Sequence, residues 1–229
     1  MGHIEAIIFD KDGTLFSFQD TWTVWAHTVL EELTENDTEM QAAATAIGFD
    51  LNGGVFLGNS VVIAGTAAEI TRVLEPILPK RLDILEVLDT IAADTPQAPV
   101  PELHATLDCL SRDHVLGLMT NDSEVPARAH LAQVGIADRF SFVAGYDSGF
   151  GAKPEPGPLL AFSDAVGVAP RKTLMVGDSR HDLAAGRAAG MGTVGVLTGV
   201  ATANELVDLA DVILPDIRGI STWLGSAPV

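Results

Sequence analysis

The sequence predicts an α/β fold, a Rossmann-like three-layer sandwich with a mainly parallel sheet, into which a helical cap domain is inserted. After residue 101, short apolar segments alternate regularly with helical patterns, which is typical of parallel strands covered by helices on both faces. Residues 16–93 instead show helical patterns and hardly any strand. We therefore expect a core domain made of residues 1–15 and 96–229, and an inserted cap domain made of residues 16–95.

The first predicted strand is the apolar run 6–9, which is expected to be buried because it lacks polar alternation. Asp10 and Asp12 follow it, and Gly13 supplies a tight turn. The two carboxylates would converge at the carboxyl end of the strand, where open α/β sheets bind ligands. Such crowding is unfavourable without a cation, and Mg²⁺ prefers oxygen ligands. The alternative is that residues 10–14 form only a solvated turn.

The insertion is predicted to contain helices at residues 21–33, 40–47, 66–74 and 82–93. Asp20 is the expected N-cap of the first helix, and Ser60 is a candidate cap for the helix after residue 60. The last helix has a predicted apolar face made of Leu82, Leu85, Leu88 and Ile91.

Two kinds of side chain in the insertion bear on substrate binding. Trp22 and Trp25 are more typical of the core of the cap than of a platform for substrate. The few cations are expected on a solvated face, although one of them could meet an anionic part of the substrate; they are Arg72, Lys80 and Arg81.

The core is predicted to continue with strands at residues 115–119, 140–144, 173–176, 193–197 and 212–214. Helices are expected at residues 101–112, 124–134, 158–166, 183–189 and 204–209. Loops that follow parallel strands meet at one edge of the sheet, so polar residues directly after these strands are candidates for a common site.

Thr120 and Asn121 directly follow the second core strand and could bind a phosphate oxygen, although Thr120 or Asp122 could equally well cap the next helix. Lys153, followed by Pro154, could pair with a nucleophile and a phosphoryl group, although a Lys-Pro pair more often lies in a surface loop.

Asp178 ends a buried apolar strand, where an unpaired carboxylate would be costly, so a metal ligand is the natural interpretation. Asp182 lies one helical turn further on and could hold Lys153 or the water shell of the metal. His181, its neighbour, is given no catalytic role.

Taken in this order, these segments resemble the four signatures of the haloacid dehalogenase superfamily of phosphatases and phosphomutases. The similarity covers the whole core. It is strongest to the phosphoglycolate phosphatases, through the segments Lys-Pro-Glu-Pro-Gly-Pro-Leu-Leu from residue 153 and Gly-Asp-Ser-Arg-His-Asp-Leu-Ala-Ala-Gly from residue 177.

The resemblance implies a Mg²⁺-dependent phosphatase. Asp10 would attack phosphorus and become an aspartyl-phosphate, while Asp12 would act as acid on the leaving group and then as base on water. Mg²⁺ would be held by Asp10, by the backbone carbonyl of Asp12 and by Asp178. The charge on the phosphoryl oxygens would be offset by Thr120, Asn121 and Lys153. The expected substrate is a small phosphorylated metabolite, with phosphoglycolate as the first candidate by resemblance alone.

Two departures from the pattern leave the substrate open. Lys11 replaces the usual apolar residue inside the first motif, and residues 16–20 are not the usual entry to the cap.

A phosphomutase of the same family, which returns the phosphoryl group to a sugar, is a close rival. A dehalogenase is disfavoured because it does not need a second carboxylate such as Asp12. A phospho-receiver domain needs only about half this length.

The net charge of −18, from 13 basic and 31 acidic residues, disfavours nucleic acid and anionic membranes as partners.

The single cysteine, Cys109, cannot form an internal disulfide and is expected to be a buried, inert thiol in a helix. The sequence shows neither the layout of a signal peptide nor an apolar segment of membrane-spanning length, so a cytoplasmic protein is expected. A monomer or homodimer is expected.

Overall fold

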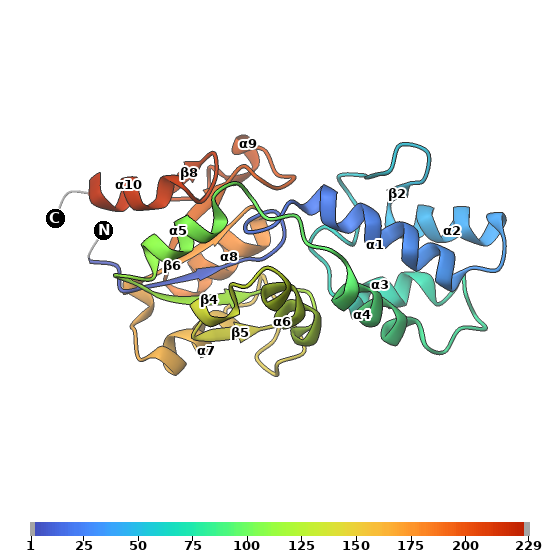
Figure 1. The fold of residues 1–229 in the computed structure, drawn as a ribbon, viewed down its shortest axis with the longest axis horizontal. Coiled ribbons are helices and arrows are strands. Elements are labelled where there is room, and N and C mark those ends of the chain that lie inside the picture. The colour runs from blue at the N-terminus through green and yellow to red at the C-terminus, as the bar shows by residue number, and fades with distance from the viewer. Residues whose placement is uncertain (1–2, 227–229) are drawn as a thin grey trace.

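The computed structural model describes residues 3–226, and its core is a six-stranded parallel sheet (Figure 1). The strand order is β5-β4-β1-β6-β7-β8. The strands are β1 (Ala6–Phe9), β4 (Val115–Met119), β5 (Phe142–Ala144), β6 (Thr173–Gly177), β7 (Gly192–Val196) and β8 (Val212–Leu214). From β1 the chain builds outward on one side and then returns to the other side, so β1 lies at the point where the order reverses. Ligands bind at such a point in open α/β sheets.

Register brings three strand ends together at this point. Phe9, the last residue of β1, is paired with Leu118 of β4 and Val176 of β6. The backbone N–H of Asp10 continues the ladder by donating to the carbonyl of Val176 at 2.8 Å. The loops that leave β1, β4 and β6 therefore start side by side.

Helices cover both faces of the sheet. The helices of the core are α5 (Leu103–Leu110), α6 (Glu124–Gln133), α7 (Gly157–Val166), α8 (Arg180–Ala189), α9 (Ala203–Leu206) and α10 (Gly219–Ser226). Alternate residues of β1 supply the two sides: Phe9 packs in one apolar cluster with residues of α5, α6 and α10, and Ile8 packs in another with residues of α7 and α8. The predicted α/β class with a mainly parallel sheet is confirmed.

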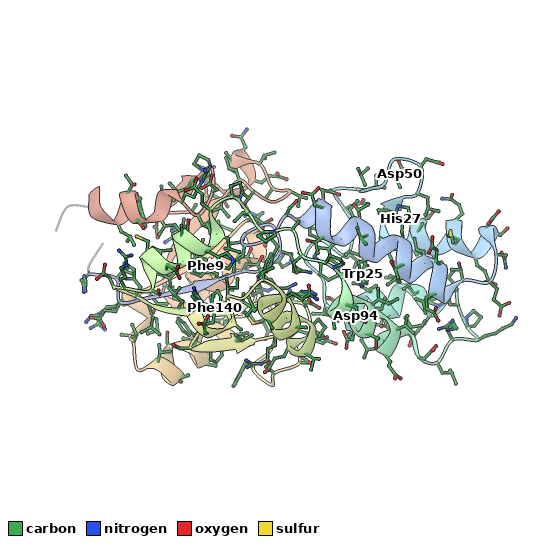
Figure 2. The ribbon with its side chains drawn as sticks, in the orientation of Figure 1. Phe9, Trp25, His27, Asp50, Asp94 and Phe140 are labelled. Carbon is green, nitrogen blue, oxygen red and sulfur yellow. The ribbon has the colours of Figure 1, made fainter. Side chains whose placement is uncertain are left out.

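A second group of helices lies beside the sheet and is joined to it by two connecting segments of the chain (Figure 1). These helices are α1 (Phe18–Leu33), α2 (Asp37–Ile47), α3 (Ala67–Leu74) and α4 (Ile84–Asp94). They have an apolar cluster of their own, which includes Trp25 (Figure 2). Burial of apolar surface within each group is the main stabilising contribution to both. Residues 16–95, which contain these four helices, are the proposed cap.

Several local predictions for the cap were wrong. Ser17, and not Asp20, is the N-cap of α1, and its Oγ accepts a hydrogen bond from the backbone N–H of Asp20 at 3.4 Å. Thr66, and not Ser60, caps α3, where Glu69 completes a capping box. Leu82 precedes α4 and is 98% exposed, so it is not part of the buried face of that helix.

Other elements were not predicted from the sequence. A short antiparallel hairpin, β2 (Phe49–Asp50) with β3 (Val55–Phe56), interrupts the helices of the cap, and α10 extends the core beyond β8. Cys109 is exposed on α5 and not buried as predicted, with its Sγ 3.7 Å from Ser221 Oγ. Within residues 3–226, every helix is too short or too polar to cross a membrane.

Candidate active site

The turn after β1 brings the first carboxylates to the sheet edge. Asp10 is 7% exposed, and the chain then turns back so that the backbone N–H of Leu15 donates to the carbonyl of Lys11 at 2.8 Å. Gly13 has a positive φ of 77°, and a Cβ at this position would lie 2.5 Å from the carboxyl group of Asp178. Glycine is therefore needed both for the turn and for the close approach of Asp178.

Lys153 lies at the centre of the site. Its Nζ donates to Asp10 Oδ1 at 2.5 Å, to Asp182 Oδ1 at 2.7 Å and to the carbonyl of Met119 at 3.0 Å. Asn121 holds the backbone of Lys153 from both sides, because its Oδ1 accepts from the N–H of Lys153 and its Nδ2 donates to the carbonyl, each at 3.0 Å. The ammonium group thus reaches the nucleophile candidate from a loop that is itself fixed.

Two carboxylates come from the end of β6 and the start of α8. Asp178 is 5% exposed, and Thr14 Oγ1 donates to its Oδ1 at 3.4 Å. Asp182 forms a capping box with Ser179: its Oδ2 accepts from the N–H of Ser179 at 3.0 Å and from its Oγ at 2.7 Å. Since its Oδ1 accepts from Lys153, both oxygens of Asp182 already have partners.

Burial and mutual repulsion disfavour the charged forms of these carboxylates. Burial, followed by the charge of Asp182, raises the pKa of Asp10 to about 7, although Lys153 opposes the shift. Burial, followed by the charges of Asp10 and Asp182, raises the pKa of Asp178 well above its usual range. One ammonium group therefore does not balance three buried carboxylates.

The donor set fits a divalent cation. One oxygen each of Asp10, Asp178 and Asp182 lies within 4.8 Å of the others, and an all-oxygen set suits Mg²⁺. Asp10 and Asp178 would hold the ion, because both oxygens of Asp182 are engaged by Ser179 and Lys153. A bound cation would supply positive charge, which would offset the negative charge of the two carboxylates and of a phosphoryl group.

A second buried cation, Lys11, contacts Asp12. The side chain of Lys11 is fully buried, with its Nζ 2.9 Å from Asp12 Oδ2, 3.1 Å from Asp122 Oδ2 and 2.8 Å from His130 Nδ1. The Nζ also lies 5.3 Å from the centre of the Trp22 ring. This contact between the first motif and the cap has the geometry of a cation–π interaction.

The partners of His130 identify its tautomer. Its Nε2 lies 2.6 Å from the carbonyl of Ala92 in α4 and can only donate to it, so Nδ1 is left to accept from Lys11. Burial, followed by the charge of Lys11, lowers the pKa of His130 to about 4. Burial raises the pKa of Asp122 to about 6. His130 was not predicted from the sequence, and Asp122 was predicted only as a helix cap. A lysine that directly follows a buried apolar strand was the signal that such partners are needed.

The structure brings all the predicted site residues to one cavity between the sheet edge and the cap, lined among others by Asp10, Asp12, Thr120, Asn121, Lys153, Asp178 and Asp182. The side chain of Asn121 is engaged by Lys153, and its Nδ2 also donates to the carbonyl of Ala64 in the cap at 2.8 Å. Thr120 Oγ1 accepts from the N–H of Asp122 at 3.1 Å, but the N-cap of α6 is Ser123, and neither Thr120 nor Asp122. The roles of both residues toward phosphate stay predictions.

Residues 4–190 match the family described as haloacid dehalogenase-like hydrolases. The chain is 31% identical over 200 residues to a phosphoglycolate phosphatase of Neisseria gonorrhoeae, an alignment that covers 86% of this chain and 81% of the relative. A phosphoglycolate phosphatase of Neisseria meningitidis is 30% identical over 230 residues, with 99% and 92% covered.

Solved structures of low sequence identity share the fold. A phosphatase from Thermococcus onnurineus has a TM-score of 0.70 at 22% identity, with 99% of this chain and 100% of that chain covered. An L-2-haloacid dehalogenase from Xanthobacter autotrophicus has a TM-score of 0.66 at 17% identity, with 98% and 100% covered. Because the two descriptions name different reactions, the fold alone does not decide the chemistry.

Replacing Lys11 with Met removes the cation that faces Asp12 and Asp122. We expect Lys11→Met to lower the free energy of unfolding by about 3–5 kcal/mol at pH 7.5, because it leaves buried carboxylates without a partner. The matched control is Lys172→Met, which removes a half-exposed ion pair with Glu5 and should cost at most about 1 kcal/mol. Urea unfolding measures both, and equal losses in the two variants would contradict the role given to Lys11.

Binding of a divalent cation should be linked to proton release. The pKa of Asp10, raised to about 7, means that the carboxyl group of Asp10 is largely protonated below that pH in the metal-free protein. A cation binds the ionised form, so its apparent affinity should fall as the pH drops from 8 to about 5.5. Titration of Mg²⁺ calorimetrically in two buffers of different ionisation enthalpy measures the protons released. An affinity that is independent of pH would contradict this account.

Proposed function

The chain belongs to the haloacid dehalogenase-like hydrolase family, and from this premise we propose that it is a Mg²⁺-dependent phosphomonoesterase. Its substrate would be a small phosphorylated metabolite, and the reaction would pass through an aspartyl-phosphate on Asp10. The observation that carries the proposal is the contact of 2.5 Å between Lys153 Nζ and Asp10 Oδ1. It holds a buried carboxylate in a fixed orientation at the end of β1.

In the first step, a carboxylate oxygen of Asp10 attacks phosphorus while the bond from phosphorus to the ester oxygen breaks. Asp12 donates a proton to that oxygen, so the product leaves as a neutral alcohol. Lys153 offsets charge on the phosphoryl oxygens, and bound Mg²⁺ would add to this effect. Because the ammonium of Lys153 is already in place, little reorganisation is needed when charge develops.

In the second step, the Asp12 carboxylate takes a proton from a water molecule, whose oxygen attacks the phosphorus of the aspartyl-phosphate. The bond from phosphorus to the Asp10 oxygen breaks, which releases phosphate and restores the carboxylate. Lys11 supports this cycle because its Nζ, 2.9 Å from Asp12 Oδ2, holds the acid and base group in one position.

Asp10→Asn should abolish nearly all turnover while the fold is retained, because the amide cannot act as the nucleophile. We expect a loss of about 1,000-fold or more in kcat, by comparison with the removal of other catalytic nucleophiles. Phosphate release from p-nitrophenyl phosphate with Mg²⁺, and then with excess chelator, is the assay. Asp108→Asn, which alters an exposed aspartate on α5, is the control and should retain full activity.

Wild-type turnover in Asp10→Asn, or turnover that chelator does not affect, would contradict the proposal. A phosphomutase of the same family would instead be revealed if transfer to a sugar phosphate exceeded transfer to water in the presence of a sugar bisphosphate primer.

A further inference from the structure

The wall of the cavity opposite the phosphate site is apolar. The cap contributes mainly hydrocarbon and aromatic side chains to it, among them Trp22, Trp25, Val62, Ile63, Ile70 and Leu88. Trp22 lies directly over the Lys11 ammonium beside Asp12, the group expected to protonate the leaving oxygen. The part of a substrate that leaves with its ester oxygen would therefore be surrounded by these side chains.

Lysine and arginine side chains are scarce in the cavity, and those present are engaged; His181 is the one histidine among the lining residues. Of the Lys and Arg residues between positions 3 and 226, only Lys153 lines it, with Lys11 directly behind Asp12. Lys153 pairs with Asp10 and Asp182, and Lys11 pairs with Asp12 and Asp122. Neither ammonium group is available for a second anionic group on the substrate.

The polar groups on the cap side favour an uncharged ligand in the same way. Asp89 of α4 also lines the cavity, where Ser123 Oγ donates to it at 2.7 Å, and its carboxylate would repel an anion. Trp22 is only 8% exposed, and its Nε1 has no hydrogen-bond partner among the described residues. One neutral N–H suits a single neutral acceptor oxygen but does not compensate a buried carboxylate.

Arg72 of α3 does not change this balance. It lines the neighbouring groove with Glu69 and Glu155 and is not among the residues that line the cavity that holds Asp10. The groove and the cavity adjoin, since Lys153 and His181 line both. Arg72 was one of the cap cations considered for an anionic part of the substrate, and it lies outside the apolar wall.

We propose that the site selects phosphate monoesters of small, uncharged and mainly apolar alcohols. This inference rests on the proposed phosphatase function and assigns its substrate class. The apolar wall stabilises the leaving group by burying its hydrocarbon surface, and Trp22 Nε1 donates to a neutral oxygen if the alcohol carries one. Phosphoglycolate carries a carboxylate next to the ester carbon and is then a poor substrate, even though the relatives are named phosphoglycolate phosphatases.

The test compares esters of nearly equal shape that differ in charge. Carboxymethyl phosphate, which is phosphoglycolate, is compared with carbamoylmethyl phosphate and isobutyl phosphate, which are neutral at the same position. We expect kcat/KM for phosphoglycolate to be about 100-fold lower than for either neutral ester, which is the scale on which a buried, unpaired charge is penalised. Phosphate release with saturating Mg²⁺ measures all three.

A charge introduced into the apolar wall should shift the preference. Ile63, which is half-buried in a loop of the cap, is the position for Ile63→Lys, with Ile63→Met as the matched neutral control. Ile63→Lys should raise kcat/KM for phosphoglycolate about tenfold and lower it for isobutyl phosphate, whereas Ile63→Met should leave the ratio near that of the parent protein. Thermal unfolding checks that both variants are folded.

The outcomes separate this inference from the proposed function. Turnover of phosphoglycolate equal to that of the neutral esters, or less than tenfold below it, overturns the substrate class but leaves the phosphatase intact. If Arg72→Ala then abolishes phosphoglycolate turnover alone, the neighbouring groove is the true leaving-group site. No release from any ester, p-nitrophenyl phosphate included, overturns the phosphatase and with it the substrate class.

Discussion

The ammonium group of Lys153 among the buried carboxylates of Asp10 and Asp182 is the interaction on which the rest of the site depends. Buried carboxylates repel one another and are poorly solvated, so their gathering at one sheet edge requires positive charge at a fixed place. The strand order supplies the place, because the order reverses at β1 and the loops after β1, β4 and β6 start together. Glycine at position 13 lets Asp178 approach, since a Cβ there would collide with its carboxyl group. The remaining negative charge explains why the site suits a divalent cation.

Lys11 joins the first motif to the cap by a separate route. Its ammonium group contacts Asp12 on the motif, and through the ring of His130 it is connected to the carbonyl of Ala92 in α4. Asp12, the proposed acid and base, and α4, a helix of the proposed cap, are thereby parts of one buried network. Hydrogen bonds of this kind are directional, so the network ties the position of the cap to the orientation of Asp12.

The sequence was most informative where burial and chain geometry act locally. A short apolar run followed by Asp10 and Asp12 indicated both a buried strand and a site, because parallel strands gather their carboxyl ends at one edge. Contacts between distant residues were not predictable: Lys11 and His130 are 119 positions apart, and no local pattern pairs them. Cys109 was misjudged because it lies next to an apolar stripe, at a position where the side chain faces solvent. At the start of α1, Ser17 and Asp20 both suit an N-cap by residue type, and the fold decided between them.

The most direct test of this account is chemical trapping of the covalent intermediate. The enzyme is mixed with substrate and Mg²⁺, quenched in acid during turnover and treated with borohydride, which reduces an aspartyl-phosphate to homoserine. Mass spectrometry of the digested chain then locates the modified residue. The account predicts homoserine at position 10, and its absence from Asp10→Asn. Homoserine at another aspartate, or steady turnover with no modified aspartate, would contradict the assignment of Asp10 as the nucleophile held by Lys153.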